Sequence, residues 1–223
     1  MTRRSVRAQA GIGMTSERTR QRLIDRLQRG GISDPCVLEA IRVVPRHLFV
    51  DEALASRAYE DIALPIGFGQ TMSQPYVVAL MTQAVCGGRA LGQVLEIGTG
   101  CGYQTAVLSQ LAETVYTVER VQELFRQARD RLFDLKFRNV KYRHGDGMQG
   151  WSEHAPYDGI LVAAAPPNVP EVLLAQLAVG GRMVVPVGAR DLQTLTIIER
   201  SRDGFEYQEL EAVNFVPLVS GTT

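Results

Sequence analysis

The sequence has no excess of either charge, because 24 Lys and Arg residues balance 24 Asp and Glu residues. This balance gives no reason to expect nucleic acid or an anionic membrane as a partner. No apolar run approaches the roughly 20 residues that a membrane-spanning helix needs. The basic first 13 residues contain no apolar segment, so they do not resemble a secretory signal. We therefore expect a cytoplasmic protein.

Cysteine is also scarce, and its pattern excludes two kinds of structure. The three cysteines are odd in number and widely spaced, at Cys36, Cys86 and Cys101. No C-x-x-C pair occurs, and the three histidines show no metal-ligand spacing, so we expect neither a disulfide framework nor a metal site. Cys101 lies in a glycine-rich turn with no histidine near it in sequence. We therefore interpret Cys101 as a small residue that fits a tight turn rather than as a catalytic nucleophile.

What the chain does contain is enough apolar sequence for one α/β domain with a sizeable core. It has 223 residues, of which 45% are hydrophobic. We expect residues 1–14 to form a flexible tail and residues 15–223 to form a single domain. Within that domain, 15–90 is predicted to be mainly helical, and 91–223 is predicted to be an alternating α/β core.

Apolar spacing and turn residues predict an order of elements along the domain. Helices are expected in 15–48 (two, separated by Gly30 and Gly31), 75–86, 103–111, 122–135 and 170–177. Strands are expected at 94–97, 115–118, 140–143, 158–164, 182–186, 194–199 and 210–216. Residues 49–74 are irregular in pattern. The alternation predicts a doubly wound, mostly parallel, Rossmann-like sheet with helices on both faces and an antiparallel C-terminal end.

A glycine-rich turn follows the first strand of the core and precedes a helix, which is where an open α/β sheet binds its ligand. Gly98, Gly100 and Gly102 form G-x-G-x-G, with Glu96 two residues upstream. A dinucleotide fingerprint would need a small residue where Tyr103 stands. The spacing resembles motif I of class I methyltransferases, and an acid beside the turn suits the cationic groups of S-adenosylmethionine. A glycine-rich loop without a ligand is the alternative.

Two further acids follow the next strands of the predicted core. Glu119 ends the second strand, where an acid can accept hydrogen bonds from both ribose hydroxyls and disfavours a 2′-phosphate. Asp146, followed by Gly147, lies just past the third strand and could accept a hydrogen bond from an adenine amino group. Each has an ordinary alternative: a surface glutamate at a strand end, and a common Asp-Gly turn.

The segment Gly67-Phe68-Gly69-Gln70-Thr71-Met72-Ser73-Gln74-Pro75 narrows the resemblance to one family. It resembles the signature G-x-G-Q-T-(I/M)-S-Q-P of the protein-L-isoaspartate O-methyltransferases. Further blocks resemble that family in the same order along the chain, at 44–50, 157–166, 180–188 and 215–218. The resemblance covers about residues 15–219.

The resemblance implies a function and a set of site residues. A methyl group would pass from S-adenosylmethionine, leaving S-adenosylhomocysteine, to isoaspartyl residues of damaged proteins, and so begin their repair; no metal is implied, and we expect a monomer. The implied cofactor residues are Thr71, Met72, Ser73, Glu96, Gly98, Gly100, Glu119, Asp146 and Gly147. Ser73 would be catalytic and, with the backbone of Val216, would bind the substrate. Many bacterial relatives have arginine where this chain has Asn214.

The chemistry of such a reaction needs no general base, because a carboxylate with a pKa of about 4 is already ionised at neutral pH. It needs alignment with the methyl–sulfonium bond and removal of water. The segment 67–75 is expected to act as a flexible cover, so we expect 15–90 to be the substrate-cover part of the domain and 91–223 its cofactor-binding core. Ser73 could donate a hydrogen bond to the carboxylate, cap the helix that begins near Pro75, or do both. Two other functions stay open: a class I methyltransferase with a different substrate, and a cofactor-binding module without catalysis.

Overall fold

The structure, a computed structural model, describes residues 15–189 and 192–223, so the expected tail 1–14 lies outside the described residues. The α-helices are α1 (Glu17–Arg29), α2 (Pro35–Val43), α3 (Pro75–Cys86), α4 (Tyr103–Leu108), α5 (Gln122–Asp134) and α6 (Glu171–Ala175). Short 3₁₀ helices are η2 (Arg46–Phe49), η3 (Glu52–Arg57), η4 (Gly147–Gln149) and η5 (Ser152–His154). None of the helices in the described ranges is both long and apolar enough to cross a bilayer.

Nine strands form two sheets in the described chain. The strands are β1 (Leu64–Gly67), β2 (Gln70–Met72), β3 (Leu91–Ile97), β4 (Ala112–Glu119), β5 (Val140–His144), β6 (Tyr157–Val162), β7 (Leu177–Ala189), β8 (Leu192–Arg200) and β9 (Phe205–Val213). The large sheet has the order β5-β4-β3-β6-β7-β8-β9. Strands β3 to β7 are parallel, and β8 and β9 are antiparallel to their neighbours. The predicted fold class is confirmed, including its antiparallel end.

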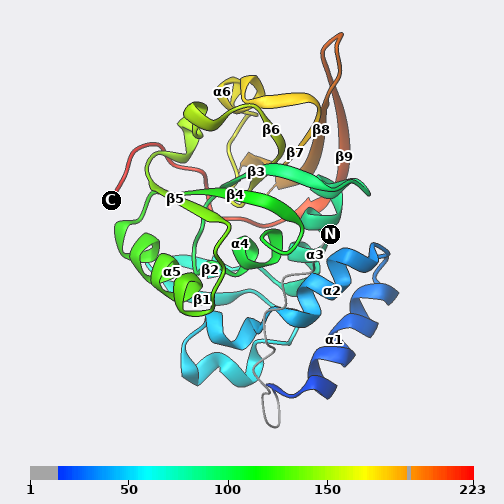
Figure 1. The fold of residues 1–223 in the computed structure, drawn as a ribbon, viewed down its shortest axis with the longest axis vertical. Helices are drawn as coiled ribbons and strands as arrows, with labels where there is room; N and C mark the ends of the chain where they lie inside the picture. The colour runs from blue at the N-terminus through cyan, green and yellow to red at the C-terminus, as the bar shows by residue number, and fades with distance from the viewer. Residues whose placement is uncertain (1–14, 190–191) are drawn as a thin grey trace.

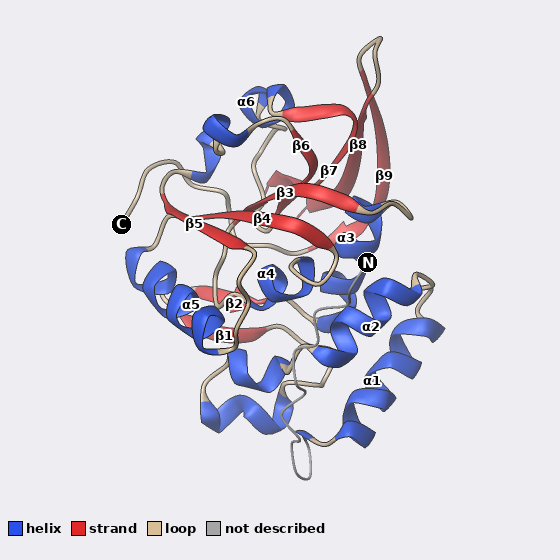
Figure 2. Cartoon of the chain, viewed as in Figure 1, coloured by secondary structure: helices blue, strands red, loops and turns tan. Residues whose placement is uncertain are grey.

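Helices cover both faces of the large sheet, but unequally (Figures 1 and 2). One face packs against α1 to α5 through a core that runs from Leu23 to Phe215. The other face packs against α6, whose Leu173 and Leu174 meet side chains of β3, β6 and β7. The two halves of the predicted domain, 15–90 and 91–223, contribute to one core on the first face. Their roles as substrate cover and cofactor-binding core remain predictions.

The chain reverses its direction across the sheet between β3 and β6. From β3 it moves outward to β4 and β5, and then returns to place β6 on the other side of β3. In an open α/β sheet this reversal leaves a crevice at the carboxyl ends of the strands, where no crossover connection fills the space. The glycine turn 98–102 lies directly above this point because it follows β3.

Residues 49–74, which show no periodicity in sequence, contain a β-hairpin of β1 and β2. Three successive residues at its tip have positive φ: Gly67 (87°), Phe68 (54°) and Gly69 (68°). The strands have four and three residues, which is too short for alternation to be read from sequence. The expectation of an irregular segment was therefore wrong at this point, because backbone pairing rather than an apolar pattern defines these strands.

The segment after β2 is anchored by Arg46, which is wholly buried. Its Nε donates to the carbonyl oxygen of Ala58 at 2.7 Å, and its Nη2 donates to the carbonyl oxygen of Ser73 at 2.7 Å. The guanidinium also lies 4.6 Å from the ring centre of Tyr103 on α4. One buried cation therefore connects the N-terminal helices, the 70–74 segment and the helix after the glycine turn.

The N-terminus of α3 is capped from outside the helix. Gln74 occupies the N-cap position and makes no side-chain capping bond. Instead, Oδ1 of Asp61 accepts the N–H of Tyr76 at 2.9 Å. No described residue forms a hydrogen bond with the hydroxyl of Ser73. Asp61 thus fills the capping role that was the alternative reading of Ser73.

Candidate active site

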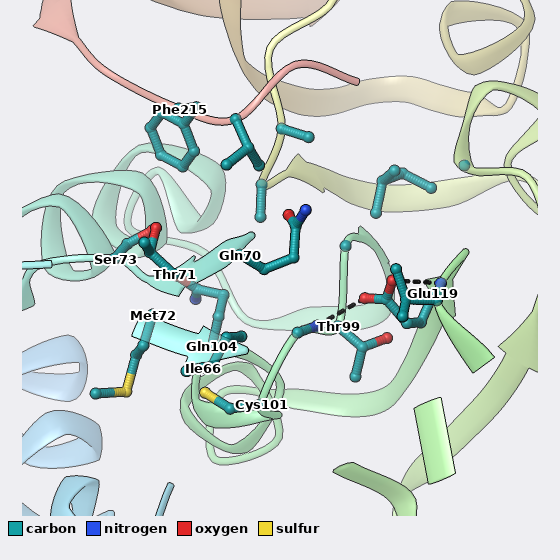
Figure 3. Close-up of a pocket in the computed structure, with 18 of the residues that line it drawn as sticks. Ile66, Gln70, Thr71, Met72, Ser73, Thr99, Cys101, Gln104, Glu119 and Phe215 are labelled. Atoms are coloured by element: carbon teal, nitrogen blue, oxygen red, sulfur yellow. Dashed lines mark hydrogen bonds between the residues drawn. The ribbon is translucent and has the colours of Figure 1, made fainter. Parts of the chain in front are cut away.

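A cavity of about 230 Å³ opens at the reversal point of the sheet. Its walls come from the carboxyl ends of β3, β4 and β6, from the glycine turn, from β2 and from residues 215–219. Figure 3 shows Thr71 and Ser73 at one end with Phe215 above them, and Glu119 at the other end. Segments far apart in sequence therefore meet around one elongated space.

The glycine turn has backbone angles that favour glycine. Gly98, Gly100 and Gly102 have φ of 92°, 54° and 90°. The N–H of Gly98 donates to the carbonyl oxygen of Val118 at 2.8 Å, which ties the turn to the end of β4. A Cβ on Gly102 would lie 3.0 Å from Cδ1 of Leu132, so the turn also packs closely on α5. Gly98 and Gly100 line the cavity with bare backbone.

Glu119 lies at the end of β4, lines the cavity and is only 5% exposed. Its Oε2 accepts the N–H of Gly100 at 2.8 Å, and its Oε1 accepts the N–H of Val121 at 2.9 Å (Figure 3). Each oxygen has a second lone pair, so the carboxylate retains acceptor capacity toward the cavity. The same side chain therefore holds the glycine turn in place and presents acceptors beside it.

Glu96 lies beneath the turn and not among the residues that line the cavity. Its Oε2 accepts hydrogen bonds from the hydroxyls of Thr105 at 2.5 Å and Thr117 at 2.6 Å. Since Thr117 donates to Glu96, its oxygen accepts from Thr99, 2.6 Å away in the turn. Complete burial raises the pKa of Glu96 to about 8, so at neutral pH the carboxyl group is mainly protonated. Glu96 reaches the turn through this chain of threonine hydroxyls.

Asp146 and Gly147 lie at the start of η4. Oδ1 of Asp146 accepts the N–H of Met148 at 2.8 Å, and Oδ2 accepts the N–H of Gly221 at 2.8 Å. Asp146 is not among the lining residues, whereas Gly147 is. A Cβ on Gly147 would lie 2.5 Å from Cγ2 of Ile97. Close packing on β3 therefore requires glycine at this position, which allows the backbone to border the cavity.

The other end of the cavity contains Thr71, Met72 and Ser73 on one side and the segment 215–219 on the other. Met72 is buried, whereas Ser73 is half-buried with a hydroxyl that no described residue engages. The carbonyl oxygen of Val216 accepts the N–H of Ala165 at 2.8 Å. Within the described chain the N–H of Val216 has no acceptor. The structure thus brings together a free hydroxyl and a free backbone donor at this end.

Sequence reasoning missed Gln193, a positioning residue on β8 that is 4% exposed. Its Nε2 donates to the carbonyl oxygen of Phe215 at 3.0 Å, and its Oε1 accepts the N–H of Phe215 at 2.7 Å. This pair of bonds fixes the wall that faces Ser73. The sequence gives no distinct signal for it, because Gln193 is one of several polar residues in β8 and nothing identifies its partner.

At the Ser73 end the cavity wall offers no evident general base among the described residues, since Glu119 lies at the opposite end. Its ionisable groups are Cys101, Tyr103, Glu119 and Arg120, and no histidine lines it. Burial raises the pKa of the Cys101 thiol and raises that of Tyr103 to about 12, so both keep their protons at neutral pH. Nowhere in the described ranges do three His, Cys, Asp or Glu side chains gather as metal ligands would. The site is built to bind and align rather than to abstract a proton.

Comparison with known proteins identifies the family of the chain. The family described as "Protein-L-isoaspartate(D-aspartate) O-methyltransferase (PCMT)" matches residues 18–223. The chain belongs to this family. Relatives named protein-L-isoaspartate O-methyltransferase include one from Methylobacillus flagellatus, 57% identical over 96% of this chain and 98% of its own. Another, from Pseudomonas paraeruginosa, is 59% identical over 93% of this chain and 99% of its own.

Solved structures of the same family have the same fold. A protein-L-isoaspartate O-methyltransferase aligns with a TM-score of 0.82 and 30% identity, covering 90% of this chain and 66% of its own. A putative member from Plasmodium falciparum aligns with a TM-score of 0.76 and 25% identity, covering 90% of this chain and 98% of its own. That second protein was crystallised in complex with S-adenosyl-L-homocysteine. The predicted membership of the protein-L-isoaspartate methyltransferase family is therefore confirmed.

Proposed function

We propose that this chain transfers a methyl group from S-adenosylmethionine to the free α-carboxylate of isoaspartyl residues in damaged proteins, as the first step of their repair. The observation that carries the proposal is the free hydroxyl of Ser73 at one end of a cavity whose other end is a glycine turn and Glu119. The cavity combines a nucleoside-type binding end with a donor for a carboxylate. Membership of the family supplies the substrate class.

The residues of the glycine-turn end fit S-adenosylmethionine. Gly98 and Gly100 expose backbone to the cavity, and Glu119 keeps lone pairs for two ribose hydroxyls. Gly147 borders the space where an adenine ring would lie, while Asp146 and Glu96 would act from behind the wall. The bound cofactor supplies a methyl group on a sulfonium leaving group.

At the other end the substrate carboxylate needs orientation and a dry environment. In an isoaspartyl residue the chain runs through the side-chain carbonyl, so the α-carboxylate is free and is ionised at neutral pH. We propose that the hydroxyl of Ser73 and the N–H of Val216 hold one carboxylate oxygen. The other oxygen would then be free to attack along the cavity, with Thr71 and Met72 as the wall beside it. With S-adenosylmethionine bound, its methyl group would pass from sulfur to that oxygen as the carbon–sulfur bond breaks, and no proton would have to move.

The test of the proposed function is methyl transfer from radiolabelled S-adenosylmethionine to a pair of peptides that differ only in one linkage. The isoaspartyl peptide is expected to be methylated, whereas its aspartyl twin, with a differently placed carboxylate, is not. Labelling of neither peptide would contradict the proposal and favour a methyltransferase with another substrate. Tight binding of S-adenosylhomocysteine without transfer to any carboxylate would favour the cofactor-binding module.

Glu119→Ala is expected to weaken binding of S-adenosylhomocysteine by about 1 to 3 kcal/mol, because hydrogen bonds to a charged acceptor are lost. Titration calorimetry measures this change. Glu119→Gln is the matched variant, because its single carbonyl oxygen retains only part of the acceptor capacity. Its affinity for S-adenosylhomocysteine should lie between those of the wild-type protein and Glu119→Ala. Equal affinity for all three proteins would show that Glu119 does not contact the cofactor.

We also propose that the protein works in the cytoplasm as a monomer. The three cysteines are free thiols in the structure, with Cys86 and Cys101 buried. Reduced, unpaired cysteines are typical of reducing compartments. The substrates would be isoaspartyl-containing proteins and peptides, and the balanced charge of the chain offers no reason to expect nucleic acid.

A further inference from the structure

A second cavity of about 520 Å³ adjoins the reaction end of the first. The two cavities share Thr71, Ser73, Ala163, Phe215 and Val216. A substrate whose carboxylate lies at Ser73 therefore has neighbouring residues that can occupy the second cavity, which we call the flanking groove. Because an extended chain advances by about 3.3 to 3.6 Å per residue, the groove is reached within a few residues of the isoaspartyl position.

The far wall of the flanking groove comes from Tyr76 at the start of α3 and from residues 211–214 at the end of β9. Among its described lining residues, Glu211 alone carries a charge. A register shift in the pairing of β8 with β9, between Thr194 and Thr196, occurs beside this point. Such a bulge changes the direction in which side chains leave a strand. Glu211 is half-buried and contributes to the groove rather than to the outer surface.

Tyr76 orients Glu211 without neutralising it. The Tyr76 hydroxyl donates to Oε2 of Glu211 at 3.1 Å. The pKa of Tyr76 is raised, mainly by desolvation and then by the hydrogen bond and charge of Glu211 and the charge of Asp61. The phenol therefore stays a neutral hydrogen-bond donor. In the described chain Oε1 of Glu211 has no hydrogen-bond partner. The groove thus presents one fixed, uncompensated carboxylate close to the reaction end.

We propose that Glu211 is a specificity-determining residue, which favours isoaspartyl sites with a lysine or arginine side chain within three residues in the substrate chain. This inference rests on the proposed function. A cationic side chain fits because it supplies donors for the free oxygen and an opposite charge in a partly desolvated groove. An acidic side chain at the same place would meet like charge. A small apolar groove wall alone would make no such distinction.

The experiment measures kcat/KM for isoaspartyl peptides that carry lysine, acetyl-lysine or glutamate at one position at a time, from three residues before the isoaspartyl residue to three after it. Acetyl-lysine keeps the length of lysine and removes its charge. A half-exposed ion pair predicts a lysine to acetyl-lysine ratio of about threefold to fivefold at one or two positions. High salt should reduce this ratio in the wild-type protein, because the pair is partly open to solvent.

The variants are compared by the same ratio of kcat/KM for the lysine peptide to kcat/KM for the acetyl-lysine peptide. A substitution that lowers activity on all peptides equally leaves this ratio unchanged. Glu211→Gln should bring the ratio to about 1, and Glu211→Lys should turn the preference toward glutamate. Glu206→Gln is the matched control: it removes the same charge from the same strand, does not line the groove, and should leave the ratio as in wild type. An unchanged ratio in Glu211→Gln would overturn the inference, and so would equal use of lysine and acetyl-lysine at all six positions by the wild-type protein.

The two proposals fail in different ways. If no isoaspartyl peptide of any charge is methylated, the proposed function fails. If uncharged isoaspartyl peptides are methylated with no charge preference at any position, the function stands and the role of Glu211 is wrong.

Discussion

Ser73→Ala should lower turnover on an isoaspartyl peptide by on the order of a hundredfold, equivalent to about 3 kcal/mol of transition-state stabilisation. The hydroxyl has no described protein partner, so its removal breaks no bond that holds the fold. The affinity for S-adenosylhomocysteine and the free energy of unfolding should therefore stay close to wild type. Single-turnover kinetics, calorimetry and urea unfolding on one preparation measure all three quantities.

Asp61→Ala is the control that separates alignment of the substrate from capping of α3. Asp61 accepts the N–H of Tyr76, so its loss should cost about 1 kcal/mol of unfolding free energy. Ser73→Thr, which keeps a hydroxyl, should recover part of the lost turnover. Normal turnover in Ser73→Ala together with lowered stability would show that Ser73 has a structural role only.

Glu96→Gln should change how stability depends on pH. The pKa of Glu96 is raised from its usual value of 4.5 to about 8. Between these values the unfolded chain loses a proton that the folded protein keeps, so folding stability falls as pH rises. The slope is about 1.4 kcal/mol per pH unit, or roughly 3 kcal/mol between pH 5 and 7. Glutamine cannot titrate, and its carbonyl oxygen can accept the hydrogen bonds of Thr105 and Thr117.

The measurement is the free energy of unfolding of both proteins at several pH values between 5 and 8. Relative to wild type, the variant should gain roughly 3 kcal/mol from pH 5 to 7. Glu113→Gln makes the same chemical change at an exposed site on the neighbouring strand β4. Its free energy of unfolding relative to wild type should not rise comparably over this pH range. Parallel curves for wild type and Glu96→Gln would mean that Glu96 is ionised in the folded protein.

The parts of the fold that sequence predicted well are those set by local rules. The bounds of α3 follow from proline at its first turn and from glycine after it, at Gly87, where φ is 54°. The glycine turn follows from spacing alone. The mostly parallel sheet with an antiparallel end follows from the alternation of strands and helices, which gives way at the C-terminus to two strands joined by a short turn.

The parts that could not be predicted depend on contacts between distant residues. Asp61 caps a helix that begins 14 residues later, and Gln193 holds Phe215 across the sheet. Arg46 reaches a carbonyl oxygen that belongs to Ser73. Nothing in the neighbouring sequence marks these side chains, since each is an ordinary polar residue until the fold brings its partner within reach. For the same reason the threonine bonds beneath the turn, which surround Glu96, emerge only in three dimensions.

The wall of the cavity opposite Ser73 consists of residues 215–219, which also pair with Ala165 beside β6. All the other lining segments lie between residues 66 and 164. During synthesis on the ribosome the glycine turn and Ser73 therefore emerge more than a hundred residues before the wall that closes over them. A chain in which residues 215–219 have not yet docked lacks the wall opposite Ser73, so we expect its site to be open and hydrated. Methyl transfer is accordingly expected to begin only after that wall has emerged and docked.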